Sequence, residues 1–103
     1  MKYSIIYATN YNHDSMTIND TILRVVARKF VLPVMIAIGD RTMGYIEIQR
    51  ATNAKPVPLA RALKSLVQND LAKREEIAGG RVNYTLTARG RKALKFAQEI
   101  VKI

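Results

Sequence analysis

The segment 56–68 carries side chains that can bind nucleic acid. Its candidate contact residues, together with the lysine that precedes it, are Lys55, Val57, Arg61, Lys64, Ser65 and Gln68. The last four lie at positions i, i+3, i+4 and i+7, which is the spacing of one face of an α-helix. Arg and Gln can each form two hydrogen bonds with a base edge, worth about 1–3 kcal/mol of discrimination, whereas Lys64 is better suited to phosphate. This face is therefore predicted to contact a major groove; the alternative is an ordinary hydrated helix surface.

A second group of cations surrounds a predicted β-hairpin and consists of Lys73, Arg74 and Arg81. Gly79-Gly80 supplies the two positive φ angles that a tight hairpin turn requires, and residues 82–86 alternate between apolar and polar as a strand does. Because Arg81 lies beside the turn, the hairpin over residues 74–84 is predicted to reach a minor groove or the DNA backbone. A charged hairpin tip is also a common device for solubility, and that alternative stays open.

Two further cations, Arg89 and Arg91, lie in the first turn of a predicted C-terminal helix that Thr87 caps. An exposed cation at this end of a helix opposes the helix dipole by about 0.3–1 kcal/mol. A phosphate across an interface would reverse the sign of that contribution. The hypothesis is that Arg89 or Arg91 contacts the DNA backbone, and the alternative is that both side chains stay hydrated.

The charge distribution favours a polyanionic partner. The chain has a formal net charge of +9 at pH 7, from 17 Lys and Arg against 8 Asp and Glu. Residues 50–95 hold eleven of these cations and three of the acids, so less than half of the chain accounts for +8 of the +9. Such a basic half suits double-stranded DNA, although a merely soluble basic surface has the same composition.

No combination of residues in the sequence forms a catalytic or metal site. Glu75 and Glu76 are adjacent in a predicted strand, so their carboxylates point to opposite faces and cannot act as a pair. His13 is the only histidine, which is too few for a zinc site or a catalytic triad. The segment "GDRTMGYI" has two glycines at the spacing of a phosphate-binding loop, but Tyr45-Ile46 follows where that loop needs Lys and Ser or Thr. We therefore expect no enzymatic activity, no cofactor and no metal.

The composition also bounds the cellular setting. The chain has 103 residues and no cysteine, which excludes disulfides and thiolate metal sites. Its longest apolar run, residues 30–38, is too short to span a bilayer, and residues 2–10 lack the length and cleavage site of a signal peptide. We expect a cytoplasmic protein with no membrane partner, built as an N-terminal arm over residues 1–16 and one domain over residues 17–103.

Four predicted helices precede the hairpin and cover residues 18–29, 30–38, 45–52 and 56–68. The first opens with a cap at Thr17. The second is apolar nearly all round and is followed by Gly39, so we expect it to be the central buried helix. In the fourth helix, Leu59, Leu63 and Leu66 form the inner face, which turns the polar side chains outward.

The order of predicted elements indicates the fold. After a turn at Asn69-Asp70, a strand over residues 71–77, the hairpin, a second strand and a helix over residues 88–103 complete the chain. Helix, helix, short strand, helix, helix, strand, hairpin, strand and helix is the order of a winged helix. The predicted class is α+β and mainly helical: a winged helix-turn-helix with a β-hairpin wing and a C-terminal dimerisation helix.

Four segments carry patterns of a known group: "RKFVLPVMIAIGD", "MGYIEIQRAT", "VPLARALKSLVQNDLAKREE" and "VNYTLTARGRKAL", the last with a Y-x-L-T-x-x-G signature. Over residues 29–95 the chain thus resembles the winged-helix transcription regulators of the HxlR and MarR kind. The resemblance implies that residues 56–68 are the recognition helix and that the hairpin is the wing. Phe30 stands where the family usually has tryptophan, and the cysteine common in HxlR-type sensors is absent. DNA binding is therefore implied, but no sensed signal is.

The predicted C-terminal helix is apolar over about half of its circumference, against the stripe of about 100° that one core contact needs. One side would pack on its own domain and leave a strip for a second copy, with candidate residues Leu94, Ala97, Ile100 and Val101. The prediction is a homodimeric transcription regulator that binds specific double-stranded DNA, with its two recognition helices about 34 Å apart. The alternatives are an architectural, sequence-independent DNA-binding protein and a winged helix that contacts other proteins.

Overall fold

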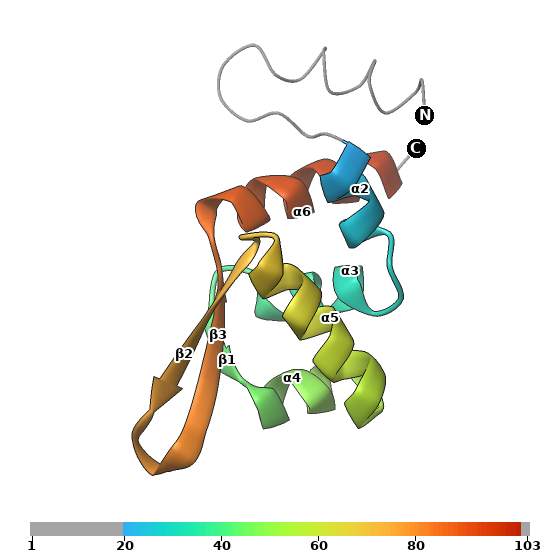
Figure 1. Ribbon diagram of the computed structural model, residues 1–103. Helices are drawn as coiled ribbons and strands as arrows, with labels where there is room; N and C mark the ends of the chain where they lie inside the picture. Colours follow the sequence, from blue (N-terminus) through green and yellow to red (C-terminus); the bar gives the residue numbers. More distant parts are fainter. Residues whose placement is uncertain (1–19, 102–103) are drawn as a thin grey trace.

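Helices and a three-stranded sheet alternate along the part of the chain that the structure describes. The structure is a computed structural model and describes residues 20–101. Its elements are α2 (Asp20–Val26), α3 (Val31–Ile38), β1 (Thr42–Gly44), α4 (Tyr45–Thr52), α5 (Pro56–Gln68), β2 (Ala72–Ile77), the 3₁₀ turn η1 (Ala78–Gly80), β3 (Arg81–Leu86) and α6 (Ala88–Val101) (Figure 1). This order confirms the predicted mainly helical α+β class. The predicted arm over residues 1–16 and the cap at Thr17 lie outside the described residues.

The connection between α2 and α3 differs from the prediction. We expected helices over residues 18–29 and 30–38, but α2 ends at Val26, so the predicted end of the first helix was wrong. Phe30 has a φ of 68°. This is the left-handed region, which costs a non-glycine residue about 1–2 kcal/mol. The half-buried Phe30 side chain packs against the core, and this tertiary contact stabilises a turn that helical periodicity does not indicate.

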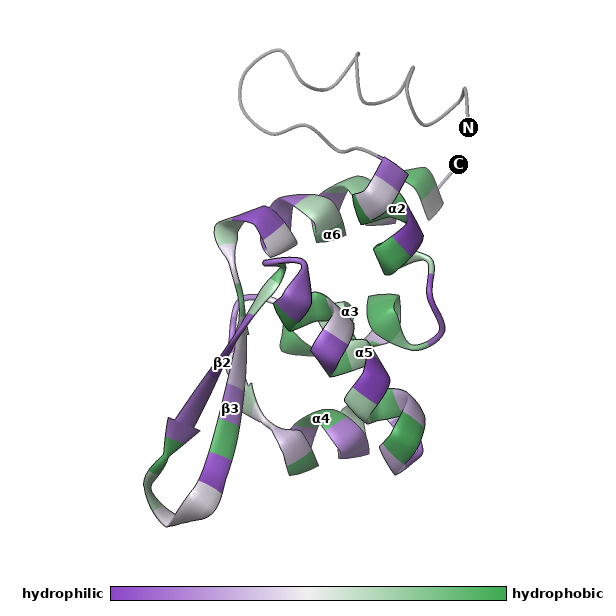
Figure 2. Cartoon of the chain, in the orientation of Figure 1, coloured by the Kyte–Doolittle hydropathy of each residue, from purple (hydrophilic) through white to green (hydrophobic). Residues whose placement is uncertain are grey.

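The helix α3 lies at the centre of the core. Its completely buried residues are Val31, Val34, Met35 and Ile38. Gly39 ends the helix with a φ of 53°, as predicted. Figure 2 shows that α3 is apolar over nearly all of its length. This confirms the expectation of a central buried helix, although the Ile36 side chain is 51% exposed.

The sheet is antiparallel with the strand order β1–β3–β2, and its outer part forms the wing, which we define as residues 72–86. Met43 in β1 and Arg74 in β2 both pair with Tyr84 in β3. Gly79 and Gly80 have φ angles of 81° and 74°, as predicted for the hairpin turn. Figure 1 shows the hairpin projecting away from the helices, so its tip is free to contact another molecule.

A hydrogen-bond network around Thr87 joins α6 to the segment between α5 and the wing. The Thr87 hydroxyl accepts a hydrogen bond from the Gly90 N–H at 2.9 Å, which confirms the predicted helix cap. The same hydroxyl donates to the Asp70 carbonyl oxygen at 2.7 Å. Gly90 packs so closely on Leu71 that an added Cβ would overlap the Leu71 carbonyl group. The start of α6 is therefore fixed to the C-terminal end of α5.

The helices of residues 20–101 are too short and too polar for any of them to cross a bilayer.

Candidate nucleic-acid interface

The helix α5 has one buried face and one exposed polar face. Leu59, Leu63 and Leu66 are at most 2% exposed, as their helical spacing predicted. The opposite side carries Arg61, Lys64, Ser65 and Gln68, which we call the α5 polar face. Three of these side chains are exposed and Ser65 is half-buried. The packing of the leucines thus orients cations and hydrogen-bonding groups toward the outside of the domain.

Two predicted contact residues lie at the start of α5. Lys55 is the N-cap residue and is exposed, while the Val57 side chain is 61% exposed. Pro56 and Pro58 occupy the first turn, where a missing backbone N–H has no helical acceptor to lose. An exposed valine next to a lysine is the kind of side chain that can contact a thymine methyl group.

A cleft separates the α5 polar face from the turn between α2 and α3, and we call it the turn cleft. Its polar lining residues are Arg28, Lys29, Arg61, Lys64, Ser65 and Gln68. The Arg28 guanidinium donates a hydrogen bond from Nη1 to the Ser65 Oγ at 3.1 Å. Arg28 and Lys29 were not among the predicted contact residues. The sequence indicated them only as two adjacent basic residues before an aromatic one. Because the first helix was predicted to continue to residue 29, no turn was expected there.

The other side of α5 faces the wing across a groove lined by Lys64, Gln68, Arg74 and Tyr84, among others. Arg74 donates a hydrogen bond to the Glu76 carboxylate, with Nη1 and Oε2 3.1 Å apart. This hydrogen bond, followed by one with the Tyr84 hydroxyl, raises the pKa of the Arg74 guanidinium above its ordinary value. Arg74 therefore stays charged, although Glu76 neutralises part of its charge.

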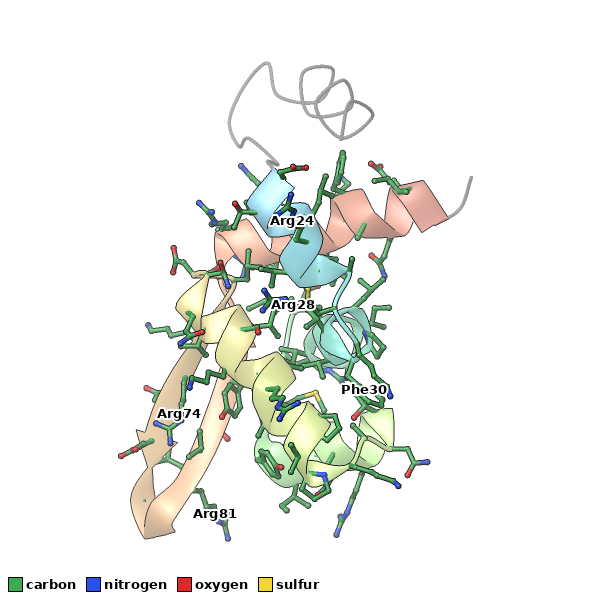
Figure 3. The ribbon with its side chains drawn as sticks, turned by 45° about the vertical axis from the view of Figure 1, so that its right-hand side comes forward. Arg24, Arg28, Phe30, Arg74 and Arg81 are labelled. Carbon is green, nitrogen blue, oxygen red and sulfur yellow. The ribbon has the colours of Figure 1, made fainter. Side chains whose placement is uncertain are left out.

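The cations of the wing are exposed, and Arg81 lies nearest the tip (Figure 3). It borders a cleft between the wing and α4, together with the exposed apolar side chains of Ile46 and Ile77. Lys73 is exposed at the base of β2. The structure therefore places Arg81, Arg74 and Lys73 along one projecting hairpin, on the side of α5 opposite the turn cleft.

The two predicted cations at the start of α6 differ in their surroundings. Arg91 donates a hydrogen bond from Nη1 to the Leu86 carbonyl oxygen at 2.9 Å. This bond satisfies a carbonyl at the end of β3 and gives the cation a structural role despite the unfavourable helix dipole. Arg89 is exposed. Of these two arginines, Arg89 is therefore the one whose whole guanidinium is directed to solvent.

The predicted dimer residues of α6 are mostly covered by the domain itself. Leu94 and Ala97 are 9% and 8% exposed, because α6 packs against α2, α3 and β3 at once. Ile100 is 37% exposed, and the side chain of Val101 lies outside the described residues. The apolar strip left for a second copy is therefore narrower than the sequence pattern indicated.

Within residues 20–101, no three His, Cys, Asp or Glu side chains lie close enough together to hold a metal ion. Glu75 and Glu76 follow one another in β2, opposite Asn83 and Val82 of β3. Adjacent residues of a strand face opposite sides of the sheet, so these two carboxylates do not converge.

Comparison with known proteins agrees with this architecture. Residues 25–103 match the HxlR-like helix-turn-helix family. A protein of Methanocaldococcus jannaschii described as an uncharacterised HTH-type transcriptional regulator is 31% identical over an alignment of 78 residues, which covers 72% of this chain and 73% of that protein.

Two solved structures have a similar fold. A protein from Porphyromonas gingivalis W83, described as a transcriptional regulator of the MarR family, is 27% identical with a TM-score of 0.71, over 86% of this chain and 94% of that one. Diamide-treated YodB from B. subtilis is 22% identical with a TM-score of 0.73, over 81% and 85% of the two chains. These matches confirm the resemblance found in the sequence.

Proposed function

The chain belongs to the HxlR-like helix-turn-helix family, which is a family of transcriptional regulators and not of enzymes. We propose that it binds specific sequences of double-stranded DNA as a homodimer. Membership of this family implies DNA binding. The proposal concerns its mode: α5 enters the major groove, and the wing contacts the minor groove or the backbone.

One observation carries this proposal. The leucines of α5 are buried, so Arg61, Lys64 and Gln68 are exposed along a single helix face. The residues that line the turn cleft beside this face include four cations and no carboxylate. A helix face of this charge and width suits a major groove, whose edges are phosphates and whose floor presents hydrogen-bonding groups.

The side chains divide into two roles in this arrangement. Arg61 and Gln68 can each form paired hydrogen bonds with a base edge, so we assign sequence discrimination to them. The other predicted contact cations are assigned to phosphates: Lys55, Lys64, Lys73, Arg74, Arg81, Arg89 and Arg91. Arg91 already donates to the Leu86 carbonyl, which makes Arg89 the stronger candidate of that pair.

The homodimer is proposed to form through the C-terminal end of α6. It is supported by the exposed Ile100 near the C-terminal end of α6. Pairing through this end would give two recognition helices related by a two-fold axis, which read half-sites about 34 Å apart on one face of the DNA. A monomer in sedimentation at micromolar concentration would contradict it.

One titration tests the function against its alternatives. Affinity is measured for random duplexes and for genomic fragments at two salt concentrations. Specific binding predicts selected fragments that bind far more tightly than random ones. Architectural binding predicts similar affinity for every duplex, with a slope of log K against log salt near −0.9 per phosphate contacted. A winged helix devoted to protein contacts predicts no duplex binding at ordinary salt, which would refute the proposal.

A further inference from the structure

The turn cleft brings together cations from two distant parts of the chain. Arg28 and Lys29 come from the turn between α2 and α3, whereas Arg61 and Lys64 come from α5. Figure 3 shows Arg28 beside α5, far from Arg74 and Arg81 on the wing. Four cations surround one cleft, and no carboxylate is among the residues that line it. The cations repel one another, and an anion bound between them would offset this repulsion.

The position of Arg28 is fixed by its surroundings. The turn is closed by backbone hydrogen bonds from the Arg28 N–H to the Val25 carbonyl and from the Val31 N–H to the Arg28 carbonyl, both 3.1 Å long. Phe30 lies within the turn that the second of these hydrogen bonds closes. Its backbone is in the left-handed conformation, and its ring packs against the core. A non-glycine residue in this conformation marks a turn that the surrounding structure stabilises at some cost. The turn is therefore a rigid support for its cations.

Ser65 orients the Arg28 side chain. One of the five N–H groups of the guanidinium donates to the Ser65 Oγ at 3.1 Å, and Arg28 as a whole remains exposed. The other donors are then free for a planar, doubly hydrogen-bonded contact with a phosphate. Since Ser65 is half-buried and already accepts this bond, its hydroxyl is poorly placed to read a base.

We infer that Arg28 binds a phosphodiester group of the DNA strand beside the groove that α5 enters, and that Ser65 is a positioning residue that acts through Arg28. This rests on the proposed function. The α5 residues that border the cleft, from Arg61 to Gln68, span about 10 Å at a helical rise of 1.5 Å per residue. Each strand carries a phosphate for every 3.4 Å of duplex axis, so a cleft of this length faces more than one phosphate and suits a continuous backbone better than one small anion.

The charge test compares Arg28→Gln with Arg24→Gln. Arg24 lies in α2, four residues before Arg28. Its side chain is 78% exposed, and Asp20 pairs with it at 3.6 Å. This control therefore removes the same charge from a neighbouring site. Arg28→Gln is expected to weaken binding about tenfold at low salt on specific and random duplexes alike. It should also reduce the salt slope by about 0.9, while Arg24→Gln changes neither. Unaltered binding by Arg28→Gln would overturn the inference.

The positioning test uses Ser65. Ser65→Ala should weaken binding without changing the salt slope or the preferred sequence, Ser65→Thr should restore affinity through its hydroxyl, and Ser65→Ala should have no further effect in the Arg28→Gln background. A changed sequence preference, or an undiminished effect in that background, would overturn the role assigned to Ser65. Equal thermal unfolding of all variants and the wild type verifies that each one folds.

A last arm separates the two sources of phosphate. Inorganic phosphate is titrated into the wild-type chain without DNA, and NMR signals of the Arg28 side chain report binding. Saturation by inorganic phosphate together with an unchanged DNA salt slope for Arg28→Gln would make the cleft a free-anion site and overturn the inference, leaving the proposed function intact. If the wild-type chain binds no duplex at low salt, the proposed function itself fails.

Discussion

Replacing Gly90 by alanine is expected to destabilise the domain, because the signature glycine lies where α6 meets the backbone of Leu71. An ideal Cβ at this position would overlap the Leu71 carbonyl oxygen and lie 2.9 Å from the carbonyl carbon, where ordinary contact needs at least 3.4 Å. That oxygen also accepts the Thr87 N–H at 3.1 Å. The helix must therefore move away and strain both this bond and the cap that Thr87 provides.

The magnitude follows from three contributions. Overpacking against a backbone group costs about 1–3 kcal/mol. Loss of the Thr87 cap costs about 1 kcal/mol more. Alanine is favoured over glycine inside a helix by about 1 kcal/mol, which offsets the cap. The net loss for Gly90→Ala is then about 2 kcal/mol, or a Tm lowered by about 8–16 °C in a domain of this size.

Gly44→Ala is the matched control. Gly44 has a φ of −78°, and an added Cβ there would lie no closer than 3.5 Å to the Glu47 carboxylate oxygen. This substitution should change stability by less than about 1 kcal/mol, because alanine restricts the unfolded chain but is a poorer N-cap residue than glycine at the start of α4. Urea unfolding followed by circular dichroism compares the two variants with the wild type. If Gly90→Ala is as stable as Gly44→Ala, the close contact has no energetic weight and the reasoning is refuted.

The other expectations concern DNA and the dimer. Arg61→Ala should reduce the preference for specific over random duplexes more than the affinity for random ones, and an equal loss on every sequence would make Arg61 a phosphate contact. Arg81→Ala should lower the salt slope by about 0.9 without changing sequence preference, and an unchanged slope in fluorescence titrations would contradict a backbone role for the wing tip. Arg91→Ala should lower the free energy of unfolding by about 1 kcal/mol through loss of its bond to the Leu86 carbonyl, whereas Arg89→Ala should not, as urea unfolding will decide. Ile100→Glu should disrupt the proposed dimer and give a monomer in sedimentation velocity, and a dimer that persists in this variant would exclude this end of α6 as its interface.

The elements set by local pattern were predictable from the sequence. The bounds of α4 and α5 follow from prolines, turn residues and the spacing of the leucines, all of which act within a few residues. The hairpin turn follows from Gly79-Gly80, and the start of α6 from a threonine three residues before Gly90. The exposed position of most of the α5 polar face was a consequence of the same helical geometry.

How much of α6 remains uncovered could not be predicted in this way. Its apolar width suggested a strip for a second copy, yet Leu94 and Ala97 are buried because three other elements pack on the helix. The number of elements that pack on a helix depends on the packing of the whole domain, and the periodicity of the helix alone does not predict it.

The sequence by itself determined the winged-helix order, the basic character of the domain and the helix face that carries Arg61 and Gln68. The contact between Arg28 and Ser65 was decided only by the tertiary structure. These residues are 37 positions apart, and the turn that carries Arg28 includes Phe30, whose positive φ no local preference of an aromatic residue favours. The packing of its half-buried ring against the core stabilises that turn, and this contact exists only once the helices have packed.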